Sequence, residues 1–382
     1  MSDGIAKNSA KEKGNMKMGK NIDNAIVYCE GNFGGMDGKT ANGLVRHSEK
    51  YKIIGVIDSS KAGQDTGSVL DGSPNGIMIY EDIMACLEKN GEKDIKTFIY
   101  GMAPLTGLFS KEDEQVMFYA MEKKLNIVNG LHEFLADKSH FSKKAEECGV
   151  KLHDIRKPET VNELVVFTGN ISKVRCPKIA ILGTDSAVGK RTSSTILTKA
   201  LCEKGLKAVM VATGQTGLIQ GAKYGVALDA IPEQFISGAM EKAVCRAWDH
   251  EKPDIIIIEG QGALSHPAYL SSCFIIRGSQ PDAIIVQHPP KREFLGDYPK
   301  IKMPTLESEI NLLESFSGKP VIGITLNHED MASSEIDETI IEYEKQFNLP
   351  VNDVLTYNCD CLIEKILSFF PVLKRQMQKQ AN

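Results

Sequence analysis

The sequence predicts an α/β protein built from two parallel-sheet domains, a Rossmann-like domain followed by a P-loop NTPase-like domain. Short apolar runs of strand length alternate with longer segments of helical periodicity along most of the chain, as in βαβ units. The first run leads into a glycine-rich turn and the second ends in an acid, which is the outline of a Rossmann-like unit. A later run leads into a glycine-bounded loop that ends in lysine, a pattern typical of phosphate binding.

The chain has 382 residues, which is long enough for two hydrophobic cores. We expect a disordered tail over residues 1–21, because this stretch is rich in Lys, Gly, Asn and Ser and nearly free of apolar residues. The first domain is predicted over residues 22–160 and the second over residues 161–382. Val165–Phe167 is predicted to form an edge strand before the main sheet of the second domain.

Composition narrows the class of function. The net charge is −5 and the basic residues are scattered, so a nucleic-acid groove is not expected. Nine cysteines, an odd number without a C-x-x-C pair, indicate reduced thiols in a cytoplasmic protein and not a disulfide framework or a zinc site. No apolar run approaches the length of a membrane span. We expect a small-molecule substrate, no resident metal, no nucleic-acid or membrane partner, and assembly as a homo-oligomer, either a dimer or a tetramer.

The first domain is predicted from its strands and the turns that follow them. Ala25–Cys29 is an apolar strand, and the glycine-rich segment Gly31–Thr40 and a helix through Leu44 come after it. The next strand, Lys52–Ile57, ends at Asp58. The glycine spacing does not match G-x-G-x-x-G, so no dinucleotide is expected. A degenerate mononucleotide fold, used for packing or as part of a substrate pocket, is favoured.

Two later strands of this domain, Thr97–Tyr100 and Asn126–Val128, end in small or polar residues, where open parallel sheets place their ligand crevice. The connection to the second domain is predicted between about Cys148 and Pro177, and its segment Val150–Pro158 has a strand-like core followed by a proline break. Asp154 and Arg156 either form a salt bridge at the hinge or face the site, and the structural role is favoured.

The stretch Lys178–Thr192 is the part of the sequence on which the prediction of function depends. The apolar run Ile179–Leu182 indicates a buried strand, and residues of helical periodicity follow the loop. Gly183 and Gly189 permit turns that point the loop amides inward as anion donors, and Lys190 reaches the phosphates. The N-terminus of the following helix adds its positive end.

Two details of this loop differ from the common pattern. Five residues separate its glycines, where the common loop has four, and Arg191 occupies the position of the hydroxyl that binds magnesium. The next hydroxyl, that of Thr192, comes one residue later. A shift of one residue rotates a side chain by about 100° around a helix, so the usual magnesium geometry is not assured. Arg191 instead adds a planar fork suited to phosphate oxygens. The loop is therefore predicted to hold phosphates without splitting them, through Gly183, Thr184, Asp185, Ser186, Ala187, Val188, Gly189, Lys190, Arg191 and Thr192.

Polar residues also follow the neighbouring strands of the second domain. One strand leads to Thr213–Gly217, in which Gln215 and Thr216 are candidates for substrate binding beside the loop. The apolar strand Pro253–Ile258 leads to Glu259, the usual position of a metal-linked carboxylate or a base beside a phosphate loop. Burial would raise the pKa of Glu259, which suits proton abstraction. The alternative is a carboxylate that only caps the next turn.

Two histidines and two cations fall in later loops of the same sheet edge. His266 comes after the glycine turn that follows Glu259, and His288 comes at the end of a buried strand. Both are candidates for a catalytic role. Lys291 and Arg292 are suited to a substrate carboxylate, and a solvated charge pair is the competing interpretation.

The last predicted elements are the strand Val321–Leu326, the strand Val354–Tyr357 and a packing helix over Leu362–Leu373. Asn327 follows the first of these strands and either reads a purine base or is a plain turn residue.

These motifs carry a resemblance to known proteins. Gly183–Lys190 together with Glu259–Gly262 resembles dethiobiotin synthetase and its relatives among the phosphate-loop ATPases. A closer similarity, to the two-domain D-glutamate N-acetyltransferase-like family, covers nearly the whole chain after the tail. Its motifs are Gly55–Asp58, Gly130–His132, Asp154–Arg156, Gly183–Asp185, Val188–Lys190, Thr192, Thr213–Gly217, Glu259–Gly262, His288 and Arg292.

The resemblance implies acetyl transfer from acetyl-CoA to the amine of D-glutamate, with the phosphate loop used on the coenzyme. Lys190, Arg191 and the loop amides would then bind the coenzyme phosphates. Glu259, His266 or His288 would be the base, and Arg292 with Lys291 would hold the substrate carboxylates. Two alternatives stay open. One is an ATP- and magnesium-dependent enzyme that activates a carboxylate, and the other is a nucleotide-binding regulator without turnover.

Overall fold

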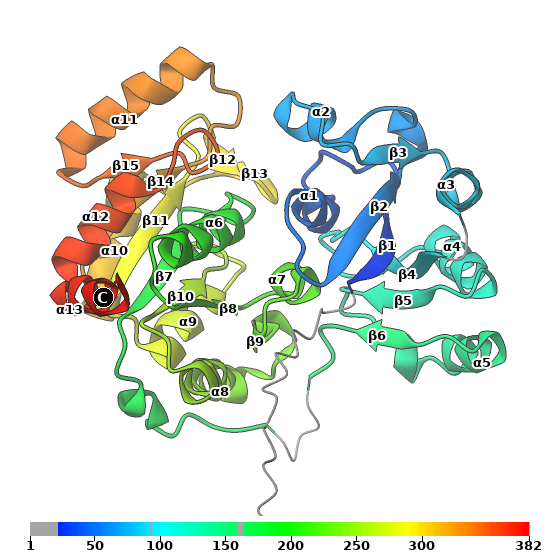
Figure 1. The fold of residues 1–382 in the computed structure, drawn as a ribbon, viewed down its shortest axis with the longest axis horizontal. Helices are drawn as coiled ribbons and strands as arrows, with labels where there is room; N and C mark the ends of the chain where they lie inside the picture. Colours follow the sequence, from blue (N-terminus) through cyan, green and yellow to red (C-terminus); the bar gives the residue numbers. More distant parts are fainter. Residues whose placement is uncertain (1–21, 92–93, 159–163, 382) are drawn as a thin grey trace, which may run out of the picture.

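The structure is a computed structural model that describes residues 22–91, 94–158 and 164–381. The predicted tail, residues 1–21, and the predicted domain boundary after residue 160 lie outside the described residues. Two sheets, each covered by helices on both faces, lie side by side (Figure 1). Every strand pair in these two sheets is parallel, which confirms the predicted fold class.

Within the described residues, the first sheet has six strands in the order β3-β2-β1-β4-β5-β6. Strand order reverses between β1 and β4, so the ligand crevice of this sheet is expected where those two strands end. Its strands are β1 (Asp23–Tyr28), β2 (Tyr51–Ile57), β3 (Met78–Tyr80), β4 (Ile95–Tyr100), β5 (Asn126–Asn129) and β6 (Leu152–Asp154). Its helices are α1 (Lys39–Arg46), α2 (Thr66–Asp71), α3 (Ile83–Asn90), α4 (Lys111–Glu122) and α5 (Ser139–Cys148).

The second sheet has seven strands in its described part, in the order β15-β14-β11-β7-β10-β8-β9. Its strands are β7 (Lys178–Gly183), β8 (Ala208–Ala212), β9 (Tyr224–Gly225), β10 (Ile255–Glu259), β11 (Ala283–His288), β14 (Val321–Leu326) and β15 (Val351–Asn352). The antiparallel pair β12 (Phe294–Leu295) and β13 (Tyr298–Lys302) stands apart. The helices are α6 (Lys190–Glu203), α7 (Gln215–Gln220), α8 (Glu233–Glu251), α9 (Ser271–Ser279), α10 (Leu306–Ser317), α11 (Ser333–Phe347), α12 (Asp360–Phe369) and α13 (Pro371–Ala381).

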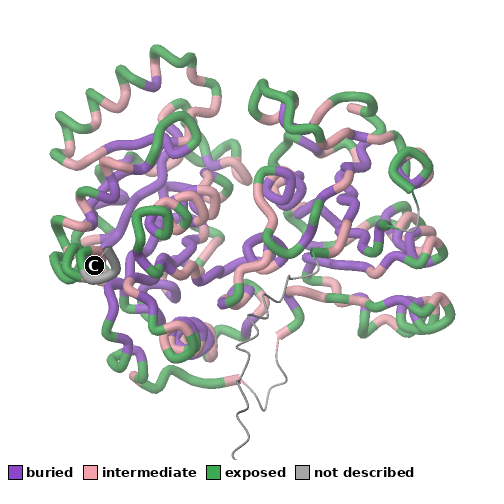
Figure 2. The backbone as a smooth tube through the Cα atoms, viewed as in Figure 1, coloured by how far each residue is buried: buried purple, intermediate pink, exposed green. Residues whose placement is uncertain are grey.

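The central strands of both sheets are buried on both faces, which explains their near-continuous apolar sequences (Figure 2). In the second sheet β7 lies between β10 and β11. The register places Glu259 of β10 opposite Ile181, and Gln287 of β11 opposite Gly183. The two strands beside β7 therefore deliver polar side chains to either side of the loop that follows Gly183.

Three of the expected elements are wrong in detail. Val165–Phe167 forms no strand, because its backbone crosses α8 at Gly238, where an added Cβ would lie 2.0 Å from the carbonyl oxygen of Val165. Val354–Tyr357 is a turn whose amides Asp353 caps, and the edge strand comes earlier, at β15. The expected helix over Leu362–Leu373 is two helices, α12 and α13, and the second begins at a proline.

Helix α7 connects β8 and β9 of the second sheet, but its side chains also contact the first domain. The Gln220 side chain donates hydrogen bonds of 2.8 Å to the carbonyl oxygens of both Gly43 and His47 at the end of α1. The hydroxyls of Thr216 and Thr40 lie 2.9 Å apart, and Ile219 is part of the hydrophobic core of the first domain. The segment that follows β8 is thus an interdomain element (Figure 1).

Candidate functional site

A cavity of about 770 Å³ lies between the two domains. The first domain contributes the glycine-rich turn Gly34–Met36, the start of α1, and residues 103–105 and 107, which follow β1 and β4 as the strand order predicts. The second domain contributes the phosphate loop, residues 214–216, and the segments that follow β10 and β14. The ligand crevices of two parallel sheets therefore open into one shared space.

The predicted phosphate loop forms between β7 and α6. Gly189 has a φ of 104°, which favours glycine, and α6 begins at the next residue. Gly183 is required for a different reason, because an added Cβ would lie 2.7 Å from the carbonyl oxygen of Gln287. Lys190 donates a hydrogen bond to the carbonyl oxygen of Asp185 within the loop. Burial lowers the pKa of Lys190 to about 8.

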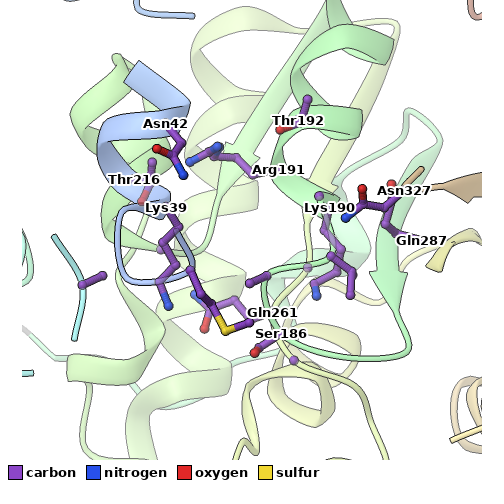
Figure 3. Close-up of a pocket in the computed structure, with 18 of the residues that line it drawn as sticks. Lys39, Asn42, Ser186, Lys190, Arg191, Thr192, Thr216, Gln261, Gln287 and Asn327 are labelled. Carbon is purple, nitrogen blue, oxygen red and sulfur yellow. The ribbon is translucent and has the colours of Figure 1, made fainter. Parts of the chain in front are cut away.

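Arg191 leaves the loop and reaches the first domain (Figure 3). Its guanidinium packs on α1, where a Cβ added to Gly43 would lie 2.4–2.6 Å from Nη2, Nη1 and Cζ. Burial lowers the pKa of Arg191, and the negative charge of Glu259 opposes that shift. The prediction that Arg191 binds coenzyme phosphates stays a prediction. The position of its guanidinium on α1 also allows Arg191 to bind a different anion in the cavity.

Glu259 lies at the tip of β10 and lines the cavity. Its side chain is buried, and Oε2 accepts a hydrogen bond of 2.9 Å from the amide of Thr213. Burial raises the pKa of Glu259, whereas Arg191 and Lys190 favour its charged form. A buried carboxylate with a raised pKa is suited to accept a proton from a bound ammonium group.

The two predicted catalytic histidines are buried, and neither is among the described residues that line the cavity. His266 accepts hydrogen bonds from the amides of Ala268 and Tyr269 at Nδ1, so Nε2 carries the proton and lies 3.6 Å from Asp185. The Nδ1 atom of His288 lies 2.9 Å from the hydroxyl of Thr184. Burial lowers the pKa of His288 to about 4, and Arg292 adds to that effect. The geometry favours Glu259 over both histidines as the base.

The two predicted carboxylate-binding cations already bind protein carboxylates. Arg292 lines the cavity, but Nε and Nη2 form a bidentate pair with Glu329, and Nη1 donates to Asp185 at 2.9 Å. Lys291 pairs with Glu335 and does not belong to the described cavity lining. Their assignment to a substrate carboxylate is not favoured by this geometry.

Gln215 and Thr216, the other predicted substrate residues, line the cavity at the start of α7. Gln215 accepts a hydrogen bond of 2.9 Å from Arg156, and Thr216 bonds to Thr40. Arg156 also binds Asp229 of the second domain, at 2.7 Å. Asp154 and Arg156 therefore do not pair with each other: Asp154 binds the amides of Leu135 and Ala136. Arg156 has both expected roles, since it forms a salt bridge between the domains and lines the cavity.

The comparisons with known proteins agree with this architecture. A model described as the P-loop domain of DUF1611, a domain of unknown function, matches residues 165–363, and the model of its Rossmann-like domain matches residues 59–158. The chain belongs to the DUF1611 family. These matches and the relatives described next confirm the predicted resemblance to the two-domain D-glutamate N-acetyltransferase-like family.

Two relatives of this DUF1611 protein are named D-glutamate N-acetyltransferase. The one from Pseudoalteromonas sp is 32% identical over 302 residues, which is 77% of this chain and 88% of the relative. The one from Tritonibacter scottomollicae is 29% identical over 286 residues, which is 73% and 84% respectively. A crystal structure of a DUF1611 family protein from Anabaena variabilis is 30% identical, with a TM-score of 0.82, over 91% of this chain and 99% of that one.

Asp58 follows β2 of the Rossmann-like domain, and its carboxylate is used within the protein. An acid at the end of the second strand ordinarily binds ribose. Here Asp58 is fully buried, and its oxygens accept hydrogen bonds from the amides of Gly31 and Phe33 and from Ser60. The carboxylate therefore fixes the glycine-rich turn, which directs the chain into α1.

Three of the cavity residues that were not predicted as site residues carry polar or charged side chains of particular interest. His132 follows β5 and lies 3.7 Å from Asp229, Gln287 lies beside the loop, and Lys39 starts α1. The sequence did contain a signal for Lys39, since the glycine-rich turn ends in Gly38, Lys39 and Thr40 just before a helix. No group of His, Cys, Asp and Glu in the described residues is arranged to hold a metal. Across the same residues, no helix is long and apolar enough to cross a membrane.

Proposed function

We propose that this DUF1611 protein transfers the acetyl group of acetyl-CoA to the amine of D-glutamate. One observation carries the proposal: a phosphate loop that lacks the usual magnesium hydroxyl shares an interdomain cavity with a buried carboxylate, Glu259. The relatives named D-glutamate N-acetyltransferase support both the reaction and the acceptor.

The residues present fit the coenzyme. Its pyrophosphate and 3′-phosphate need cations and amide donors, which Lys190 and the N-terminal turn of α6 supply. Apart from the carbonyl oxygen of Asp185, Lys190 has no hydrogen-bond partner in the described part of the chain. A cavity of about 770 Å³ is within the usual range of small-molecule sites. The thioester supplies an activated acyl carbon.

The chain's own contribution to the chemistry begins with the acceptor amine. An amino acid is an ammonium ion at neutral pH and must lose a proton before its nitrogen can attack the thioester carbon. Glu259 takes that proton, because burial raises its pKa and it lines the cavity. The neutral amine then attacks the thioester carbon, the C–N bond forms, and the nitrogen loses its second proton to solvent. The C–S bond breaks, and the leaving thiolate takes up a proton from solvent.

The decisive experiment measures thiol release from acetyl-CoA with D-glutamate, L-glutamate, D-aspartate and a neutral D-amino acid. D-Glutamate is expected to give the fastest release and an N-acetylated product by mass spectrometry. Glu259→Gln keeps an acceptor for the amide of Thr213 and is expected to lower kcat while acetyl-CoA still binds. Glu307→Gln, at the exposed start of α10, is the matched control. Absence of thiol release with every amino acid would overturn the proposal.

A further inference from the structure

The cations that line the cavity differ in whether the protein itself already binds them. Arg292 binds Glu329 and Asp185, Arg156 binds Asp229, and Arg46 binds Asp71. Arg191 and Lys39 also line the cavity, and neither has a hydrogen bond or an ion pair from its side chain to any described residue. Both side chains are partly exposed, so two unpaired cations that face one cavity are available to bind an anionic ligand from outside the chain.

The sequence of α1 accommodates one of these cations. Gly43 lies inside the helix with an ordinary helical φ, so the backbone does not require glycine there. A mid-helix glycine destabilises a helix by about 1 kcal/mol relative to alanine. A Cβ at this position would require the Arg191 guanidinium to move, because its atoms lie 2.4–2.6 Å from where the Cβ would be. The glycine therefore leaves room on α1 for the Arg191 guanidinium in its observed position.

Glu259 connects this pair of cations to the chemistry. The positive charges of Arg191 and Lys190 both stabilise the charged form of Glu259, and the effect of Arg191 is the larger. The proposed base therefore lies within electrostatic reach of both the cation on α1 and the cation of the phosphate loop. In Figure 3, Arg191, Lys39, Asn42 and Thr216 gather on one side of the cavity, and Lys190 lies on the other. An amino acid whose α-carboxylate binds Arg191 would hold its amine, one carbon away, towards Glu259.

We propose that Arg191 and Lys39 form the carboxylate-binding subsite for the acceptor, with Arg191 on the α-carboxylate and Lys39 on the side-chain carboxylate. This inference rests on the proposed function for the identity of the acceptor. Arg191 presents a planar fork that matches a carboxylate, whereas Lys39 is a point charge on a flexible stem. Lys39 then determines the preference for a dicarboxylic amino acid, and Arg191 binds the α-carboxylate of every amino acid that enters the site.

Equilibrium binding tests this subsite without any acetyl transfer. D-Glutamate and D-glutamine, in which a neutral amide replaces the side-chain carboxylate and the α-carboxylate is kept, are titrated calorimetrically into the whole chain. The titrations are made with and without CoA, which cannot donate an acetyl group. Arg191→Lys is expected to weaken the binding of both amino acids about tenfold or more, because the bidentate fork is lost. Lys39→Met is expected to weaken D-glutamate by a similar factor and to leave D-glutamine unchanged.

Three further variants separate a binding role from a structural one. Gly43→Ala retains both cations but displaces the Arg191 guanidinium, so it should weaken D-glutamate binding and add little in an Arg191→Lys background. Arg277→Lys and Lys96→Met are matched controls, since Arg277 lies over Phe316 and Lys96 is exposed beside Asp23. Both controls should bind D-glutamate as the parent protein does.

The subsite is overturned if the parent protein binds neither amino acid, or if Arg191→Lys binds D-glutamate unchanged. It is also overturned if Arg191→Lys weakens CoA instead, since Arg191 would then belong to the coenzyme phosphates. These outcomes differ from failure of the proposed function, in which the parent protein binds D-glutamate but releases no thiol from acetyl-CoA.

Discussion

Lys190 is a buried cation whose charge depends on pH in the physiological range. Burial lowers its pKa to about 8, so the free protein loses this positive charge as the pH rises through that value. Bound phosphates favour the charged form and raise the pKa again. We therefore expect acetyl-CoA affinity to fall above pH 8, by up to about tenfold per pH unit, with proton uptake on binding.

Calorimetry at pH 7 and pH 9, in two buffers of different ionisation enthalpy, measures both effects. Acetyl-CoA is the suitable ligand because its sulfur does not titrate. Lys190→Arg keeps a charge at every pH and should abolish the proton uptake, even if its geometry weakens binding. Equal affinities at the two pH values in the parent protein would show that Lys190 does not contact phosphate.

His288 makes stability depend on pH in the acidic range. Its pKa is about 4 in the folded chain because of burial and Arg292, against an ordinary value near 6.5. The unfolded chain therefore takes up a proton on His288 that the folded chain refuses, and stability falls as the pH falls from about 6.5 to 4. The loss reaches at most about 3 kcal/mol. Urea unfolding at pH 7 and pH 5 should show a smaller loss for His288→Asn than for the parent protein, and identical losses would contradict this account.

Arg191 and Arg292 illustrate what a sequence reveals about single residues. Both were predicted as anion binders, from their positions after a phosphate loop and after a strand. Position alone could not show that Glu329, 37 residues further on, binds Arg292 through a bidentate pair. It also could not show that Arg191 packs on Gly43 of the other domain. The sequence indicated which charged side chains would lie near the loop. It did not indicate which partners they bind, because those partners come from distant segments of the chain.

At the scale of elements, the strands with continuous apolar sequences were predicted well and the edges were not. β7 and β10 are buried on both faces, so their sequences are unambiguous. At the edges, Val165–Phe167 and Val354–Tyr357 have strand-like composition but no partner strand in the described structure. β-Propensity reflects how well a side chain packs on a pleated, half-buried surface. It does not determine whether the segment has a sheet edge to pair with.

The loop between β7 and α6 predicts an enzyme without ATPase activity. Arg191 follows Lys190 where a hydroxyl would bind magnesium, and its guanidinium lies on α1. Phosphoryl transfer depends on a positioned metal ion, so we expect phosphate release from ATP with magnesium to be indistinguishable from buffer. A colorimetric phosphate assay, with and without carboxylic acids, measures this. Sustained magnesium-dependent release would instead favour a carboxylate-activating enzyme.

At the scale of the whole molecule, the site exists only when the two domains are joined. The cavity takes its lining from both sheets, and α7 holds them together through Gln220 and Ile219. Arg156, in the connection between the domains, binds Asp229 of the second domain. Because these contacts cross the interface, we expect the described domains to unfold as one cooperative unit, and not as two separate ones.

Gln220→Leu tests that coupling. The side chain is buried, and its amide is the donor for two carbonyl oxygens at the end of α1, Gly43 and His47. Leucine has a similar size but no donor, so both carbonyls lose this partner at a cost of about 1–3 kcal/mol. Differential scanning calorimetry should show one transition for the parent protein, and a lower Tm with broadening or splitting for Gln220→Leu. Gln64→Leu, at an exposed position of the first domain, is the control and should melt as the parent does. Two resolved transitions in the parent protein would mean that each domain is stable alone, and that the contacts through α7 follow from domain packing without stabilising it.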